Sequence, residues 1–366
     1  ERIYDIGNVG IRAASFLLIP VFTHHLSQDE FGLLSTLLIT NQILLVLMAV
    51  GMRDTFVRFF GKAKDNGTVG LLLGSCIVIN FVMGIVATGV VCGFLEPFFC
   101  RLLHTDSAGS YLLLTCLVSQ GQCLCLQLMS YYRANEHPVA FLVAGVTSAL
   151  LLVCLNMVFL VGLDLGIHGA LVAYLLTYSL MFASLAIHII SRTGIGVSLV
   201  SLRASLGFGL PLLPSQVSAL LIAALPVYFL SHYRGLQTVA IFSLGQKLAQ
   251  LPSVFLVMPF QQALEPMVFN NLNAENLKEK LSNMLTYFVL IFLVIAMAFM
   301  AGSRILLSLA APSSYEEAAI VLATLLPAAF FLGLMYFGRV LLHIRLKTHV
   351  TGSVGILFAC ASPVIY

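Results

Sequence analysis

The sequence predicts an all-α polytopic membrane protein, because of its apolar runs, its composition and the placement of its charges. Runs of about 17–25 apolar residues, the length that a helix needs to cross a bilayer, alternate with short polar segments throughout the 366 residues. Hydrophobic residues make up 60% of the chain and charged residues 9%, with a mean hydropathy of +1.02. Soluble domains carry far more charge, so we expect the function to depend on membrane helices.

The apolar runs define eleven expected crossings, and we expect at least one more helix in the intact protein because both ends of the chain look cut. The first six are Ile6–Phe22, Leu33–Val50, Val69–Cys92, Ser110–Tyr131, Val139–Val161 and His168–Ile190. The other five are Phe208–Leu230, Thr238–Phe260, Ser282–Ala301, Ala318–Phe337 and Val350–Tyr366. This pattern predicts two lobes of six helices, with an N-terminal lobe over residues 1–190, a cytoplasmic inter-lobe loop over 191–207 and a C-terminal lobe over 208–366.

The lysines and arginines predict the orientation, because short cytoplasmic loops retain positive charge during insertion. With the N-terminus inside, the cytoplasmic segments carry 13 of the 18 cations: Arg2, Arg53, Arg58, Lys62, Lys64, Arg133, Arg192, Arg203, Lys278, Lys280, Arg339, Arg345 and Lys347. The outward loops carry Arg101, Arg234 and Arg304, and the predicted helices carry Arg12 and Lys247. The net charge of +3 therefore reflects membrane insertion and gives no indication of nucleic-acid binding.

The eight cysteines do not predict a metal centre. Six lie within apolar helices, where a cysteine commonly serves as a small packing residue, and no cysteine–histidine set has the spacing of a zinc site.

The two halves of the chain resemble each other weakly. Pro20 and Pro226 each lie in an outward-going helix, and Ser35 and Gln42 correspond to Ser243 and Gln250 at a constant offset. Both copies have the same orientation, which predicts two lobes related by an axis along the membrane normal. Transporters built in this way bind substrate in the cleft between the lobes.

Several segments resemble the Wzx-type polysaccharide flippases of the MOP superfamily, which are related to the lipid II flippases and MATE exporters. Segment 31–35, FGLLS, is similar to the family's "yGlys" signature, and segment 208–215, FGLPLLPS, to its "yGlPliPs" opening of the seventh helix. Segments 241–249, IFSLGQKLA, and 259–266, PFQQALEP, continue the likeness.

The resemblance implies a V-shaped MATE/MOP-like bundle in the bacterial cytoplasmic (inner) membrane. It implies the flipping of an undecaprenyl-diphosphate-linked oligosaccharide to the outer leaflet by alternating access, for surface polysaccharides such as the O-antigen of lipopolysaccharide. A polysaccharide polymerase and a chain-length regulator are the implied partners besides the lipid bilayer. No cofactor is implied, and a H⁺ or Na⁺ gradient would drive the cycle.

Two cations inside predicted helices are the candidate ligands of the diphosphate, because an ionisable group in a membrane helix normally faces protein or water. Arg12 shares a polar stripe with Asn8 and Ser15 on the first helix. Lys247 lies near one face with Ser243 and Gln250 on the eighth helix. We expect these residues and Gln42, the counterpart of Gln250, to line the central cavity. The alternative is that both cations extend to the membrane surface as anchors.

Arg53 and Arg58 follow the second helix and have two possible roles. At the inner mouth of the cleft they would capture the diphosphate headgroup, since arginine pairs with phosphate oxygens. Positive-inside retention explains the same cluster without any ligand.

Two other functions remain open. A MATE-type cation-coupled multidrug antiporter would need acidic groups in its cavity, whereas the intramembrane charges here are positive. A membrane polymerase or ligase of polysaccharide assembly would need a large outward loop with clustered acid–base residues. The outward loops are short, so we predict a transporter and not an enzyme.

Overall fold

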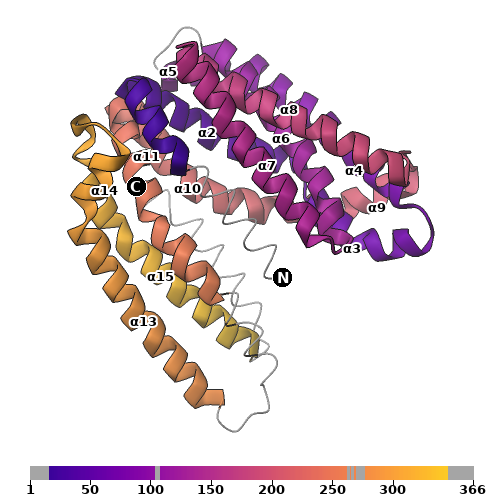
Figure 1. Cartoon of the computed structure of the whole chain (residues 1–366). Coiled ribbons are helices and arrows are strands. Elements are labelled where there is room, and N and C mark those ends of the chain that lie inside the picture. Colours follow the sequence, from indigo (N-terminus) through magenta and orange to yellow (C-terminus); the bar gives the residue numbers. More distant parts are fainter. Residues whose placement is uncertain (1–15, 104–107, 262–263, 265–267, 269–276, 345–366) are drawn as a thin grey trace. The chain divides into compact units, whose positions relative to one another are not determined.

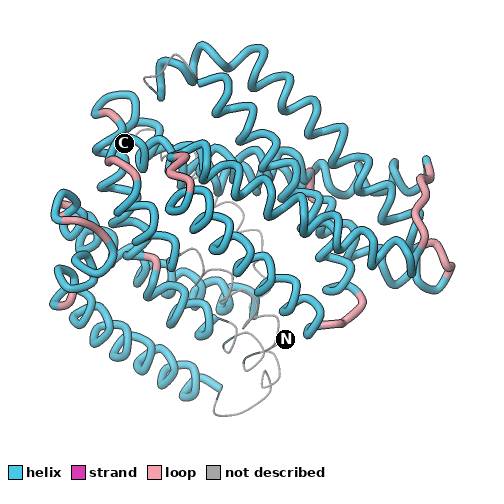
Figure 2. Tube along the Cα trace, turned by 45° about the horizontal axis from the view of Figure 1, so that its top comes forward, coloured by secondary structure: helices cyan, strands magenta, loops and turns pink. Residues whose placement is uncertain are grey.

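The computed structural model describes residues 16–103, 108–261, 264, 268 and 277–344, and no strand occurs among them (Figure 2). The chain divides into two units, Glu1–Val239 and Ala240–Tyr366.

The helices of the first unit follow one another with short connections (Figure 1). After a helix at Phe16–His25, they are α2 (Gln28–Ala49), α3 (Met52–Asp65), α4 (Val69–Val90), η1 (Val91–Leu95), α5 (Glu96–Leu103), α6 (Ala108–Ala134), α7 (Pro138–Asn156), η2 (Met157–Gly162), α8 (Gly166–Thr193), α9 (Leu199–Gly209), η3 (Leu210–Leu212) and α10 (Leu213–Arg234). Helix α11 (Leu236–Ala249) begins in this unit and continues into the second.

Helix α6 is the central helix of the first unit, and it packs against α2, α3, α4, α5, α7 and α8. Its side chains Leu112, Cys116, Cys123, Cys125 and Leu128 are buried. The three thiols are free, as expected of cysteines that serve as small packing residues.

Local chemistry sets both ends of α2. At its start, Ser27 Oγ accepts a hydrogen bond from Glu30 N–H at 3.3 Å, while Glu30 Oε2 accepts one from Ser27 N–H at 2.9 Å. This reciprocal pair is a capping box. At its end, Val50 and Gly51 both adopt positive φ angles of 45° and 65°, which breaks the helix before α3.

Segment 51–68, which lies between the second and third predicted spans and belongs to neither, contains α3. The many charged residues of this segment lower its hydropathy. However, Met52, Phe56 and Phe60 recur every four residues and are buried on one face of the helix. The segment is therefore an amphipathic helix that contributes to the core of the first unit.

The predicted inter-lobe loop over 191–207 is also largely ordered as helix. Helix α8 continues to Thr193, and α9 begins at Leu199 and packs against α4. Between them, Gly196 N–H donates to the carbonyl of Gly70 at 3.3 Å, and Ser198 N–H donates to Ser75 Oγ at 3.2 Å. These bonds attach the connection to α4.

Helix α10 falls in the first unit, while the lobe boundaries expected from the sequence, at residues 190 and 208, stay predictions. It packs along α2 and α5, and the boundary between the units therefore follows it, at Val239. The rotation that would relate two lobes stays a prediction.

The second unit has a small aromatic core. Its helices are the remainder of α11, then η4 (Ser253–Val257), α13 (Leu277–Ala301), α14 (Ser303–Ala310), η5 (Ser313–Tyr315) and α15 (Ala318–Ile344). The Phe260 and Phe288 rings stack with their centroids 4.4 Å apart, and Phe330 lies against Phe288 at 6.3 Å. Gly333 makes room for Phe288, because a Cβ atom there would overlap the ring.

Eight segments among the described residues are long and apolar enough to span a membrane. Large apolar side chains on their outer faces are exposed, for example Phe81, Ile85 and Val86 on α4. Contact between such an apolar surface and water is unfavourable, whereas contact with the hydrocarbon of a bilayer is not. The protein is therefore an integral membrane protein. Of the predicted spans, Phe208–Leu230 corresponds to α10, while 6–22 and 350–366 lie mostly or wholly outside the described residues.

Candidate functional site

The predicted ligands on the first helix, Asn8, Arg12 and Ser15, lie outside the described residues. Their shared face and their approach to a substrate therefore stay predictions.

Gln42, Arg53 and Arg58 lie in the first unit, on α2 and on the first two turns of α3. Gln42 is exposed, and Arg53 is half-buried. The guanidinium of Arg58 lies 4.7 Å from the centre of the Phe208 ring, a cation–π contact between α3 and α9. Capture of a headgroup by Arg53 and Arg58 stays a prediction, and in this structure Arg58 is already engaged in packing.

Ser243, Lys247 and Gln250 lie in the second unit on or just after α11. Their spacing of four and three residues corresponds to one face of a helix. Their environments differ, since Ser243 is buried, Lys247 is half-buried and Gln250 is exposed. Among these three, Gln250 is the residue that is exposed to a ligand.

A buried polar cluster joins α2 to α6 inside the first unit. Asn41 on α2 donates from Nδ2 to Gln122 Oε1 at 2.9 Å, and its Oδ1 accepts from Ser119 Oγ at 2.7 Å. Ser119 also donates to the carbonyl of Thr115 at 2.7 Å. Polar side chains without water must find such partners, so the cluster fixes the register of the two helices.

A second buried polar cluster joins α4 to α6. Asn80 Nδ2 donates to Gln127 Oε1 at 3.2 Å, and Gln120 Nε2 donates to the backbone carbonyl of Asn80 at 3.4 Å. Gln127 in turn contacts Ser130 Oγ at 3.4 Å. The remaining oxygens, Asn80 Oδ1 and Gln120 Oε1, are buried without a hydrogen-bond partner.

A third polar contact connects α2 to α10. Thr40 Oγ1 and the hydroxyl of Tyr228 are 2.9 Å apart, and the Tyr228 ring packs edge-on against Phe99 of α5. Nearby, Ser231 Oγ donates to the carbonyl of Leu102 at 2.6 Å.

These clusters were not predicted from the sequence. The available signal was the presence of asparagines and glutamines in otherwise apolar segments, at Asn41, Asn80, Gln122 and Gln127. Buried amides must have hydrogen-bond partners, but the sequence does not show which helices supply them. The helices are apolar on most of their surface, so no polar stripe marks the face that contacts a neighbour.

The chemistry of the clusters suits binding and packing. Their members are amides and hydroxyls, none of which is an effective general acid or base. Among the described residues, no group of three or more histidine, cysteine or acidic side chains is placed to hold a metal ion.

Comparisons with known proteins give the family and the fold. The family model described as "Polysaccharide biosynthesis protein" matches residues 3–272. A search among curated proteins finds no match.

Solved MATE transporters have a similar fold. An inward-facing multidrug resistance MATE transporter of the MOP superfamily matches with a TM-score of 0.69 at 16% identity, over 98% of this chain and 84% of that one. The Vibrio cholerae MATE transporter VcmN in its bent form matches with a TM-score of 0.61 at 19% identity, over 98% and 85%. An outward-facing MATE transporter of the same superfamily matches with a TM-score of 0.61 at 17% identity, over 99% and 84%.

Proposed function

Because the chain belongs to the polysaccharide biosynthesis protein family and has the fold of a membrane transporter, we propose that it flips a polyprenyl-diphosphate-linked oligosaccharide. The lipid is an undecaprenyl diphosphate, and movement is from the inner to the outer leaflet of the bacterial cytoplasmic membrane. The family match over residues 3–272 carries the proposal, because it ties a transporter fold to polysaccharide assembly. The family and fold are those of transporters and not of enzymes.

The charge of the candidate ligands supports an anionic substrate. A diphosphate carries about two negative charges, and moving it through a low-dielectric path without counter-charge would cost many kcal/mol. Lys247 on α11 is half-buried in a segment that is long and apolar enough to span the membrane. We assign Lys247 and Arg12 as the cations that offset the substrate's charge, with Gln42, Ser243 and Gln250 as polar groups near its path.

We also propose how the protein is oriented in the membrane and what drives transport. The N-terminus is cytoplasmic, as the distribution of lysine and arginine favours. A H⁺ or Na⁺ gradient supplies the work, and a polymerase with its chain-length regulator receives the product in the outer leaflet.

The test uses purified protein in vesicles that carry an undecaprenyl-diphosphate-linked oligosaccharide. The rate of transfer is measured by the access of an impermeant glycosidase to the sugar. Lys247→Ala and Arg12→Ala should each lower the rate by about 100-fold or more, the effect of leaving a buried charge without its partner. Arg12→Lys should retain part of the rate, because the charge matters more than the planar guanidinium.

The matched control is Arg304→Ala, which removes an exposed cation on α14 and should leave the rate unchanged. Wild-type transfer in the Arg12→Ala, Lys247→Ala double variant would show that the two cations are membrane anchors. Absence of transfer by the wild-type protein, together with export of organic cations from the same vesicles, would favour the MATE-type antiporter that the structural matches suggest.

A further inference from the structure

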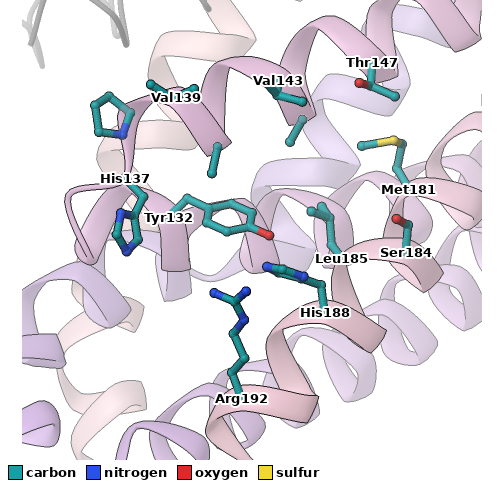
Figure 3. A pocket seen from close by; sticks show the side chains of 13 residues that line it. Tyr132, His137, Val139, Val143, Thr147, Met181, Ser184, Leu185, His188 and Arg192 are labelled. Atoms are coloured by element: carbon teal, nitrogen blue, oxygen red, sulfur yellow. The ribbon is translucent and has the colours of Figure 1, made fainter.

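A pocket of about 600 Å³ lies on the first unit, where the end of α6 and the beginning of α7 meet the last turns of α8 (Figure 3). None of the candidate substrate ligands is among its lining residues. Its residues are Tyr132, His137, Pro138, Val139, Ala140, Val143, Ala144, Thr147, Met181, Ser184, Leu185, His188 and Arg192.

One end of the pocket is polar and basic. Arg192 in the last turn of α8 points its guanidinium toward the Tyr132 ring, and His188, one turn earlier, lies beside it (Figure 3). The Tyr132 and His188 rings are 6.3 Å apart between centroids. Both Arg192 and His188 are exposed, so their polar ends are accessible to a ligand.

The backbone adds to the positive character of this end. Helix α7 begins at Pro138 after His137, with no side chain capping its first turn. The positive end of the helix dipole therefore lies among residues that line the pocket. No acidic residue is among those lining residues, and the nearest in sequence, Glu136, precedes His137 outside the pocket.

The rest of the pocket is apolar and open to the side. Val139 and Val143 on α7 have exposed fractions of 61% and 57%, whereas Met181 and Leu185 on α8 form a buried floor. Helices α6, α7 and α8 all belong to segments long and apolar enough to cross a membrane. The apolar part therefore faces the hydrocarbon of the bilayer, and the basic part lies at the helix ends, which the charge distribution places on the cytoplasmic side.

We propose that this pocket binds an anionic phospholipid of the inner leaflet. The phosphate lies at Arg192, His188 and the start of α7, and an acyl chain lies along Val139 and Val143. Charge complementarity selects the anionic headgroup, because arginine donates to phosphate oxygens and anionic leaflets attract basic side chains. The adjoining apolar wall selects a lipid over a soluble phosphate, since a free ion gains nothing from exposed valines.

The test is lipid retention by the full chain, purified in detergent and measured by native mass spectrometry. Phosphatidylglycerol and phosphatidylcholine with identical acyl chains are added in equal amounts. Wild-type protein should retain phosphatidylglycerol preferentially. In the Arg192→Gln variant the ratio of retained phosphatidylglycerol to phosphatidylcholine should be about fivefold lower, the effect expected of one basic side chain near a lipid phosphate. In the double variant, Arg192→Gln with His188→Asn, the ratio should be lower still.

Arg203→Gln is the matched control, because Arg203 is an exposed cation on α9 that does not line the pocket. It should leave retention unchanged. Equal retention in wild type and in the double variant, or an equal loss in Arg203→Gln, would overturn the proposal. So would displacement of the lipid by millimolar inorganic phosphate.

A further measurement distinguishes a phospholipid site from a site for the lipid-linked substrate. Undecaprenyl phosphate is added to the same mixture. Displacement of phosphatidylglycerol from wild-type protein by this lipid, absent in the double variant, would show a site for the lipid-linked substrate and overturn the assignment to a membrane phospholipid. Retained phosphatidylglycerol supports the assignment.

Discussion

Two adjacent amides on α2 have opposite environments. Asn41 is buried and makes hydrogen bonds to Gln122 and Ser119 on α6, while Gln42 is exposed. The sequence predicted a role for Gln42 through its counterpart Gln250, but it did not identify Asn41. Because α2 is apolar around nearly its whole circumference, no periodicity indicates which of the two amides faces α6.

The pair gives a prediction that separates stability from transport. Asn41→Ala leaves Gln122 and Ser119 each without one hydrogen-bond partner, which should lower the free energy of unfolding by about 1–2 kcal/mol. Gln42→Ala should leave it unchanged and lower the transfer rate. Thermal unfolding in detergent and the vesicle assay measure the two effects. Equal loss of stability in both variants would contradict the different environments of the two residues.

The environment of a charged group depends on neighbours distant in sequence. Arg58 illustrates this, because its cation–π contact with Phe208 joins residues from α3 and α9. The sequence alone indicated a basic cluster after the second helix. It did not distinguish capture of the substrate's headgroup from retention of positive charge on the cytoplasmic side.

At the scale of the elements, the long apolar helices were predicted well, and the shorter helices α3 and α9 were not. The span expected at 139–161 is α7 with η2, and the span expected at 168–190 is the middle of α8. Helices α3 and α9 lay largely outside the predicted spans, because a span is predicted from an apolar run of about 17–25 residues and both helices are shorter than that. An amphipathic helix is instead identified by spacing, as at Met52, Phe56 and Phe60.

The close approach of α2 to the start of α11 gives a prediction at this scale. A Cβ atom on Gly32 would overlap the backbone carbonyl of Leu236. Gly32→Ala therefore forces the two helices apart and should lower the free energy of unfolding by about 1–3 kcal/mol. Chemical denaturation in detergent measures this change in the free energy of unfolding.

Gly61→Ala is the matched control, since Gly61 lies within α3 and nothing would contact an added Cβ there. It should raise stability by about 0.5–1 kcal/mol, the usual gain of alanine over glycine in a helix. A Gly32→Ala variant as stable as wild type would contradict the close packing of α2 against Leu236.

At the scale of the whole molecule, the sequence predicted an all-α membrane transporter of the polysaccharide family, and the family match and the fold confirm it. Apolar spans and family motifs are local features that a single sequence carries. The association of α10 with α2 and α5 is not such a feature. It depends on contacts such as Thr40 with Tyr228, between residues that are 188 positions apart.

The orientation of the molecule is a further prediction. In a protein whose native cysteines are replaced, Asn66→Cys should be shielded from an impermeant thiol reagent added outside intact cells, and His25→Cys should be labelled. Both positions are exposed, and His25 lies next to the turn at Ser27 without taking part in the capping box. Labelling of both positions after permeabilisation is the control. The reverse pattern in intact cells would place the N-terminus outside.

The polar clusters between α2, α4 and α6 consist of uncharged groups: Asn41, Ser119 and Gln122 in one, and Asn80, Gln120, Gln127 and Ser130 in the other. A membrane potential does work only on charge that moves through it, about 2.3 kcal/mol per elementary charge per 100 mV. If these helices shift during transport, the voltage neither opposes nor assists the rearrangement of their amides. The voltage dependence of the transport rate would then report the charge of the substrate, of the coupling ion and of side chains such as Lys247.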